Sequence, residues 1–189
     1  VTWQLGRKSG IAVNSVQASA SVNVNPAITF KATGTPDAAF RLVADSSYTT
    51  YGTVGAFLPD PVKVQIVDQY GNGISKKYVD FEIVAVGTNS GYLNAFGNTT
   101  AKDTTDNDGF AQVRWGLGPQ VGSQNNKMRA SAKVNQVHLV NSPYVFSASA
   151  MVGGAEKLIK VTNDSSLSSI IGNTLSEYLK VKVTDGLDN

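Results

Sequence analysis

The sequence contains no cysteine, so no disulfide contributes to its stability. Disulfides are permitted but not required outside the cell, and this absence therefore leaves export open. His138 is the single histidine, which excludes a metal site with two histidines from one chain. Without cysteine or a second histidine, little remains for nucleophilic or acid–base catalysis. We therefore expect no enzyme activity, no catalytic residue and no bound cofactor, with His138 on the surface.

Charge is also scarce. Charged residues make up 16% of the chain, against about 25% in an average globular protein. The net charge is +2 and no basic run is longer than Lys76-Lys77. Because nucleic-acid-binding proteins concentrate basic residues on one face or element, we expect no nucleic-acid partner. No apolar run approaches the ~18 residues that a membrane helix needs, so we expect no membrane insertion of this segment.

Hydrophobic residues make up 41% of the chain, and several segments alternate between apolar and polar residues. This period of two is typical of strands with one buried and one solvated face. The apolar sets are Val79, Phe81, Ile83 and Ala85; Ala111, Val113, Trp115 and Leu117; and Met128, Ala130, Ala132 and Val134. Turn residues lie between the strands at 70–73, 89–91 and 106–109. The stretch 167–177 comes nearest to a helical stripe, but its glycine and hydroxyl residues favour a loop.

An internal repeat divides the chain. The motif Trp3-Gln4-Leu5-Gly6 returns as Trp115-Gly116-Leu117-Gly118, at an offset of 112 (115 − 3). Residues 62–68 return at 179–185, at an offset of 117 (179 − 62), as loop insertions would cause.

The repeat predicts three parts. Residues 1–36 would be the C-terminal part of one unit, 37–152 a complete unit, and 153–189 the N-terminal part of the next. A repeat of this size with alternating strands predicts an all-β fold of packed antiparallel sheets.

Three motifs carry a family resemblance. They are Asp68-Gln69-Tyr70-Gly71-Asn72-Gly73-Ile74, then Val79-Asp80-Phe81-Glu82-Ile83 followed by Asp106-Asn107-Asp108-Gly109-Phe110, and finally Trp115-Gly116-Leu117-Gly118. In order and spacing the unit resembles the bacterial immunoglobulin-like repeats of invasin- and intimin-type surface proteins. The resemblance implies tandem immunoglobulin-like β-sandwich domains, export to the cell surface or extracellular space, and a mechanical or adhesive role. Gly73 departs from the family pattern, which often has proline there, and this bears on the stiffness of the turn.

Several roles stay open on this basis. The first is a structural segment of a stalk, fibre or surface layer, whose partners are neighbouring immunoglobulin-like repeats. The second is an adhesin or ligand-binding module with a host or surface ligand. A third is a filament subunit whose partial domains are completed by copies of itself. An accessory domain of a secreted enzyme is a further alternative.

Aspartates supply the candidate metal sites. Asp103, Asp106 and Asp108 crowd one hairpin and could chelate calcium, but the glutamate that an EF-hand requires is missing, and a tight turn is the preferred interpretation. Asp68 and Asp185 end equivalent strands. They could share a cation with a neighbouring domain, or each could accept hydrogen bonds within its own turn, which is the preferred interpretation.

Aromatic residues supply the candidate contact sites. Trp3 and Trp115 occupy the same repeat position on an apolar strand face, so we expect both to pack in a core. Tyr48, Tyr51 and Phe57 lie in a loop-rich stretch and are predicted to be exposed.

Overall fold

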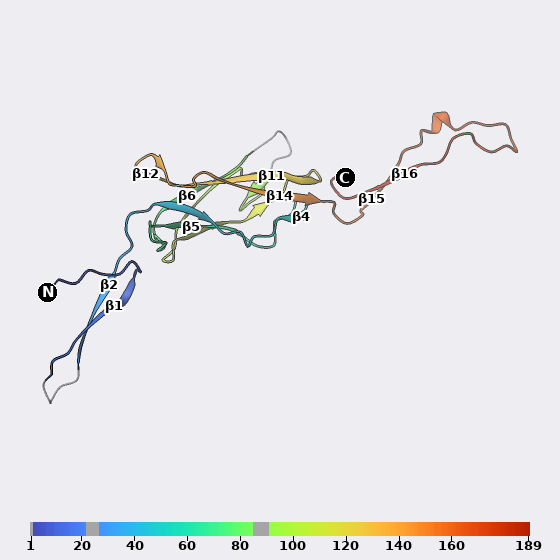
Figure 1. Ribbon diagram of the computed structural model, residues 1–189. Coiled ribbons are helices and arrows are strands. Elements are labelled where there is room, and N and C mark those ends of the chain that lie inside the picture. Colours follow the sequence, from blue (N-terminus) through green and yellow to red (C-terminus); the bar gives the residue numbers. More distant parts are fainter. Residues whose placement is uncertain (1, 22–26, 85–90) are drawn as a thin grey trace.

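The computed structural model, which describes residues 2–21, 27–84 and 91–189, consists of strands, turns and loops without an α-helix in those ranges (Figure 1). The stretch 167–177 is loop, as predicted, and a 3-10 turn, η2 (Asp164–Ser166), precedes it. No described part of the chain forms a helix that is long and apolar enough to cross a membrane. The predicted all-β class is confirmed.

The largest sheet has five strands. In sheet order they are β4 (Tyr51–Thr53), β14 (Tyr144–Met151), β11 (Gly122–Ser131), β6 (Tyr78–Ile83) and β8 (Thr100–Thr104). Neighbouring strands are antiparallel except β4 and β14, which run parallel. The Ser149 N–H donates to the Thr50 carbonyl at 2.9 Å and the Val54 N–H to the Met151 carbonyl at 3.0 Å, so this parallel pair is bonded at both of its ends.

A three-stranded antiparallel sheet faces the larger one. Its strands, in order, are β3 (Arg41–Ala44), β5 (Val62–Val67) and β9 (Phe110–Val113). Two short pairs complete this region: β7 (Tyr92–Leu93) with β10 (Trp115–Gly116), and β12 (Lys133–Val134) with β13 (Val137–His138). We call residues 41–151 the central sandwich.

One hydrophobic core joins the two sheets. Phe81 and Phe146 of the five-stranded sheet and Leu42 and Ile66 of the three-stranded sheet are at most 1% exposed, and Trp115 is completely buried among them. A core formed by side chains of two facing sheets is an arrangement of the β-sandwich type.

The predicted alternation holds for the described residues of the three segments. The buried members are Val79, Phe81, Ile83, Ala111, Val113, Trp115, Leu117, Met128, Ala130 and Ala132. Val134 is half-buried. Ala85 and the turn residues Asn89 and Ser90 lie outside the described residues.

Gly73, expected to affect only the stiffness of its turn, has a steric role. A Cβ at this position would overlap the carbonyl group of Asp108 on the neighbouring turn. Proline, or any residue with a side chain, therefore could not occupy this position without moving the 106–109 turn. The sequence pattern could not show this, because the close approach joins residues 35 positions apart (108 − 73).

The N-terminal hairpin pairs β1 (Gly10–Ala18) with β2 (Ile28–Gly34) and has the same register as β11 with β14. Each of its six described pairs falls on a β11–β14 pair when 112 is added to the first residue and 116 to the second (122 − 10 and 150 − 34). Both hairpins carry an irregularity at the same place, between Gly10 and Asn14 and between Gly122 and Asn126.

The C-terminal hairpin pairs β15 (Lys157–Lys160) with β16 (Val181–Thr184) and has the register of β3 with β5. All four pairs correspond, with offsets of 116 and 117 (157 − 41 and 184 − 67). The two outer hairpins extend from opposite ends of the central sandwich (Figure 1).

Equivalent residues differ sharply in burial. Phe30 of β2 is 54% exposed, whereas Phe146, its counterpart in β14, is 1% exposed. Leu158 of β15 is 71% exposed, whereas its counterpart Leu42 is completely buried. Trp3 was predicted to be in a core and is 39% exposed, because among the described residues no second sheet covers the N-terminal hairpin. Within the part of the chain that the structure describes, the apolar faces of both hairpins are therefore unpartnered.

This contrast predicts unequal costs for matched substitutions. We expect Phe146→Ala to lower the free energy of unfolding of the central sandwich by about 3–5 kcal/mol, because it leaves a cavity in a packed core. Phe30→Ala, at the equivalent register position, should change it by no more than about 0.5 kcal/mol. Urea unfolding followed by tryptophan fluorescence measures both. Equal costs for the two variants would show that β2 is packed in solution as β14 is.

Candidate functional site

The turn after β5 is organised by the carboxylate of Asp68. Its Oδ1 accepts the N–H of Tyr70 and the N–H of Asn72, each at 2.9 Å. Its Oδ2 accepts the side-chain amide of Asn72 at 2.8 Å and the N–H of Asp37 at 3.0 Å. Asp68 is completely buried, so these four donors replace the water that it loses. Asp37 belongs to the segment that connects β2 to β3, and this bond ties the turn to the incoming chain.

The turn after β16 repeats this arrangement around Asp185. Its Oδ1 accepts the N–H groups of Leu187 and Asn189, each at 3.0 Å, and its Oδ2 accepts the N–H of Gly153 at 3.0 Å. The side-chain amide of Asn189 lies 3.2 Å from Oδ2. Asp185 is 2% exposed, although most of the surrounding C-terminal segment is exposed. Each aspartate thus accepts bonds within its own turn, as preferred from the sequence.

The asparagine side chain of each turn also donates to a main-chain carbonyl that lies 65 or 70 residues earlier in the sequence. The Asn72 side chain donates to the Arg7 carbonyl at 2.8 Å and accepts the Ser9 N–H at 2.9 Å. The Asn189 side chain donates to the Pro119 carbonyl at 3.0 Å. Arg7 and Pro119 are also related by the offset of 112 (119 − 7). We call these two contact regions the first and second junction.

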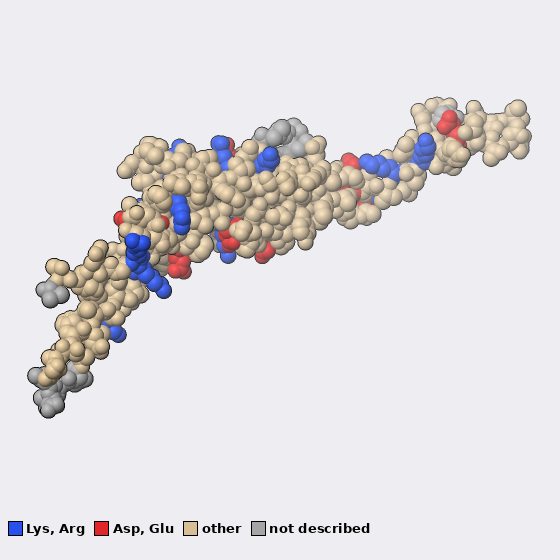
Figure 2. Space-filling view, viewed as in Figure 1, with Lys and Arg blue, Asp and Glu red and all other residues tan. Residues whose placement is uncertain are grey.

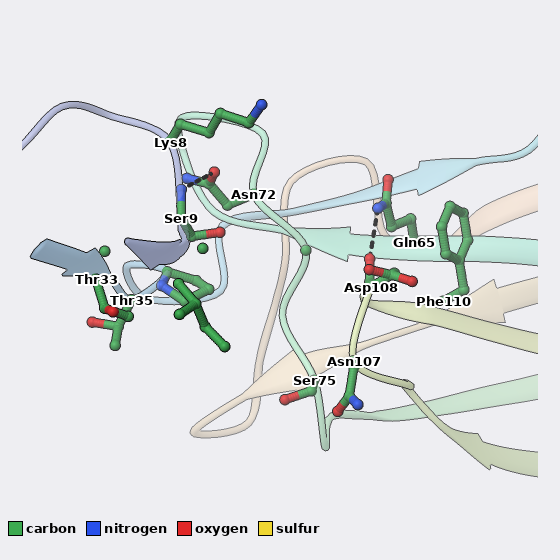
Figure 3. A pocket seen from close by; sticks show the side chains of 15 residues that line it. Lys8, Ser9, Thr33, Thr35, Gln65, Asn72, Ser75, Asn107, Asp108 and Phe110 are labelled. Atoms are coloured by element: carbon green, nitrogen blue, oxygen red, sulfur yellow. Dashed lines mark hydrogen bonds between the residues drawn. The ribbon is translucent and has the colours of Figure 1, made fainter. Parts of the chain in front are cut away.

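A groove of about 620 Å³ lies beside the first junction, between the N-terminal hairpin and the turns of the central sandwich. Figure 3 shows Ser9 and Asn72 bonded on one wall and Gln65 bonded to Asp108 on the other. The Gln65 side-chain amide donates to the Asp108 carbonyl at 2.7 Å. The first junction is therefore held by bonds between the Asn72 side chain and the main chain of Arg7 and Ser9, with polar side chains nearby.

Hydrogen bonding lowers the pKa of both aspartates. The Gly153 N–H, with the donors of Asn189 and Leu187, lowers the pKa of Asp185 from 3.8 to about 2, against the opposing effect of burial. Burial favours the neutral form of Asp68, but the donors from Asn72, Asp37 and Tyr70 outweigh it, so its pKa also lies below the usual value. Both carboxylates are ionised at neutral pH.

Asp103, Asp106 and Asp108 were predicted to share one hairpin, but β8 pairs with β6 and β9 pairs with β5, so the 106–109 turn crosses from one sheet to the other. The three aspartates make local bonds. Asp103 Oδ2 accepts the Gln112 N–H at 2.8 Å, and Asp106 Oδ1 accepts the N–H groups of Asp108 and Phe110 at 3.0 and 2.9 Å. Among the described residues no group of three or more His, Cys, Asp or Glu side chains could hold a metal ion. The preferred interpretation, a tight turn, accounts for these bonds.

His138 is exposed and its Nδ1 lies 3.2 Å from the Ser142 hydroxyl, a neighbour that the sequence did not predict. The Ser142 hydroxyl accepts the Ala132 N–H at 2.8 Å and lies 3.1 Å from the Ala132 carbonyl, to which it donates. The Ser142 hydroxyl therefore ties its own turn to the main chain of Ala132.

The aromatic candidates divide. Tyr51 is 57% exposed, as predicted. Tyr48 was predicted to be exposed but is half-buried. Its ring packs edge-on against Phe146, with ring centroids 5.2 Å apart, and its hydroxyl donates to the Ser147 carbonyl at 3.0 Å. Phe57 is half-buried, against the prediction, because the guanidinium of Arg114 lies 4.2 Å above its ring.

Several exposed aromatic residues were not singled out from the sequence, and Phe96 is the most exposed of them. Phe96 is 88% exposed and contacts Tyr92, which in turn contacts Phe57, with ring centroids 5.3 and 4.9 Å apart. Its sequence neighbours Ala95 and Gly97 give no alternation that could have marked it.

The depressed pKa of Asp185 predicts how the second junction responds to acid. At pH values above 3.8, the ordinary pKa of an aspartate, the Asp185 carboxylate is ionised and accepts the Gly153 N–H. The stability that this bond contributes is lost as the pH falls towards about 2. NMR titration of the Gly153 amide should give a midpoint near pH 2. The same titration of Asp185→Asn should show no such transition, and a wild-type midpoint at or above 3.8 would contradict the described bonding.

No protein-family model matches this chain, and no curated protein sequence matches it. The arrangement at the two junctions therefore has to be interpreted from the residues themselves.

Proposed function

We propose that this chain is a non-catalytic structural segment of a long extracellular repeat protein that forms a stalk, fibre or surface layer. Residues 1–36, 37–152 and 153–189 would be the end of one immunoglobulin-like unit, a complete unit and the beginning of the next. The family resemblance to bacterial surface repeats belongs to the same proposal.

The single observation that carries the proposal is the pair of outer hairpins. Each reproduces the strand register of a hairpin within the central sandwich, with constant offsets along each strand. Val16, Phe30 and Leu158 are exposed, whereas their counterparts Met128, Phe146 and Leu42 in the central sandwich are buried. A two-stranded hairpin is at best marginally stable alone, so these faces call for further strands of the same kind of unit.

The surface supports a structural role. Charged side chains are scattered over the face in Figure 2, with broad uncharged areas between them. Among the described residues the ion pairs have both side chains at least 44% exposed, so each contributes little to stability. Ordered polar contacts are concentrated instead at turns and junctions.

An adhesin or ligand-binding module is the alternative, and Phe96 favours it. An aromatic side chain that is 88% exposed and backed by Tyr92 and Phe57 offers a ready apolar contact. Such a site would sit on the array, so the alternative adds to the structural role.

A filament of copies with complemented partial domains has less support. By the offsets, residues 1–36 correspond to positions from 113 onward, and 153–189 correspond to 37–72. Positions 73–112 contain β6, β8 and most of β9, and neither outer segment carries a counterpart of them. Two copies joined head to tail would therefore lack strands of both sheets.

The proposal predicts the mass and location of the native polypeptide. An antibody raised against this chain should label intact source cells or their medium. On a denaturing gel it should detect a band well above 19.9 kDa, the mass of this chain alone. A band at 19.9 kDa would favour separate subunits, and a signal found only after cell lysis would contradict the extracellular role.

The proposed unit boundaries predict that residues 37–152 fold alone. All residues of the main core lie between Ala39 and Ala150, so removing both outer segments leaves that core intact. The fragment should unfold cooperatively in urea, with a midpoint close to that of the central sandwich in the whole chain. Non-cooperative unfolding would show that the outer hairpins belong to the same folding unit.

A further inference from the structure

The turns at Asp68–Asn72 and Asp185–Asn189 share the pattern Asp-x-x-x-Asn and the same outward contacts. In both, the aspartate accepts an N–H from the chain that enters the unit, at Asp37 or Gly153. In both, the asparagine donates to a carbonyl of the preceding unit. Two junctions whose aspartates are offset by 117 (185 − 68) thus use the same two outward bonds.

The groups that receive these turns are all main-chain atoms. The carbonyl acceptors belong to Arg7 and Pro119, which have no side-chain chemistry in common. The N–H donors belong to Asp37 and Gly153, which also differ. The receiving face therefore tolerates sequence change, whereas the turn needs a carboxylate and an amide at a spacing of four.

The positions between the aspartate and the asparagine adapt to each junction. Tyr70 lies under the guanidinium of Arg7, 5.4 Å from its ring centroid. Leu187, at the equivalent position, lies with its Cδ1 3.1 Å from where a Cβ on Gly55 would be. The first junction has a contact between a guanidinium and an aromatic ring, and the second has an aliphatic side chain at the same place. The outward hydrogen bonds of the aspartate and the asparagine are nevertheless the same at both junctions.

We propose that the Asp-x-x-x-Asn turn is a docking element for the preceding immunoglobulin-like unit. The main chain around residue 7 or 119, together with the incoming residue 37 or 153, would form its receiving face. The partner of this surface is a second unit of the same fold in the array. Because both bonds are directional and use fixed main-chain groups, successive units join in one orientation. This inference rests on the proposed tandem arrangement and adds that its junctions are rigid.

The test measures distances across each junction in the whole chain. The absence of cysteine allows spin labels at introduced pairs, Lys31→Cys with Lys63→Cys across the first junction and Lys127→Cys with Lys180→Cys across the second. Pulsed electron paramagnetic resonance should give one narrow distance distribution for each pair. Asn72→Ala should broaden the first distribution only, and Asn189→Ala the second only. Asn107→Ala, an exposed turn residue beside the groove, is the matched control and should change neither.

A second measurement follows the bond itself. In Asn72→Ala the Ser9 amide should exchange its hydrogen about tenfold faster, the change expected when one hydrogen bond is lost. Distributions that are broad in the unsubstituted chain, or that stay narrow in both asparagine variants, would overturn the proposal. If Asn72→Ala unfolds the central sandwich, Asn189→Ala still decides, because Asn189 lies outside the core.

The outcomes separate this inference from the proposed function. Broad distributions with a native polypeptide far above 19.9 kDa would leave the structural role in place as a flexible tether, without the docking element. Narrow distributions with a native band at 19.9 kDa would keep the docking element and overturn the long repeat protein.

Discussion

The burial of apolar side chains between two facing sheets is the interaction on which the other features of this chain depend. Phe146 and Phe30 occupy the same register position, but β14 and β11 have further strands beside them and a second sheet across the core, whereas β2 and β1 form a two-stranded sheet of their own. Backbone pairing is therefore set locally, whereas burial, which supplies most of the favourable free energy, requires strands from elsewhere. The hairpins, the junctions and the proposed array all follow from this dependence.

Uncharged polar side chains satisfy main-chain groups in this fold, in keeping with its low content of charged residues. Hydroxyl and amide side chains bond to main-chain groups that sheet pairing leaves free. Thr33 accepts the Ala12 N–H in the N-terminal hairpin, and Ser149 accepts the Gln124 N–H at the matching place in the central sandwich. Ala12 and Gln124 both have a positive φ, where the ladder is interrupted. Both bonds lie at exposed positions, where an uncharged hydroxyl satisfies a main-chain donor that the interrupted ladder leaves free.

The sequence was informative where the structure is locally periodic. The strands around Phe81, Trp115 and Met128 follow from alternation, because a pleated strand sends successive side chains to opposite faces. Exposure of Trp3 could not be predicted, since its motif resembles that of Trp115, whereas in the structure Trp115 pairs with Leu93 in a strand and lies in the core between the two sheets. The turn bonds of Asp68 followed from turn chemistry, but its bond to Asp37 joins residues 31 apart and depends on the path of the connecting segment.

The parallel pairing of β4 with β14 has a mechanical consequence. β4 lies near the beginning of the central sandwich and β14 at its end, so tension applied through the two flanking segments pulls these strands in opposite directions along their length. Their hydrogen bonds are then loaded in shear and have to break together, whereas a hairpin pulled from its open end unzips one bond at a time. Three residues of β4, which follow β3 in the chain, thus add resistance to stretching beside the strand through which the chain leaves the fold.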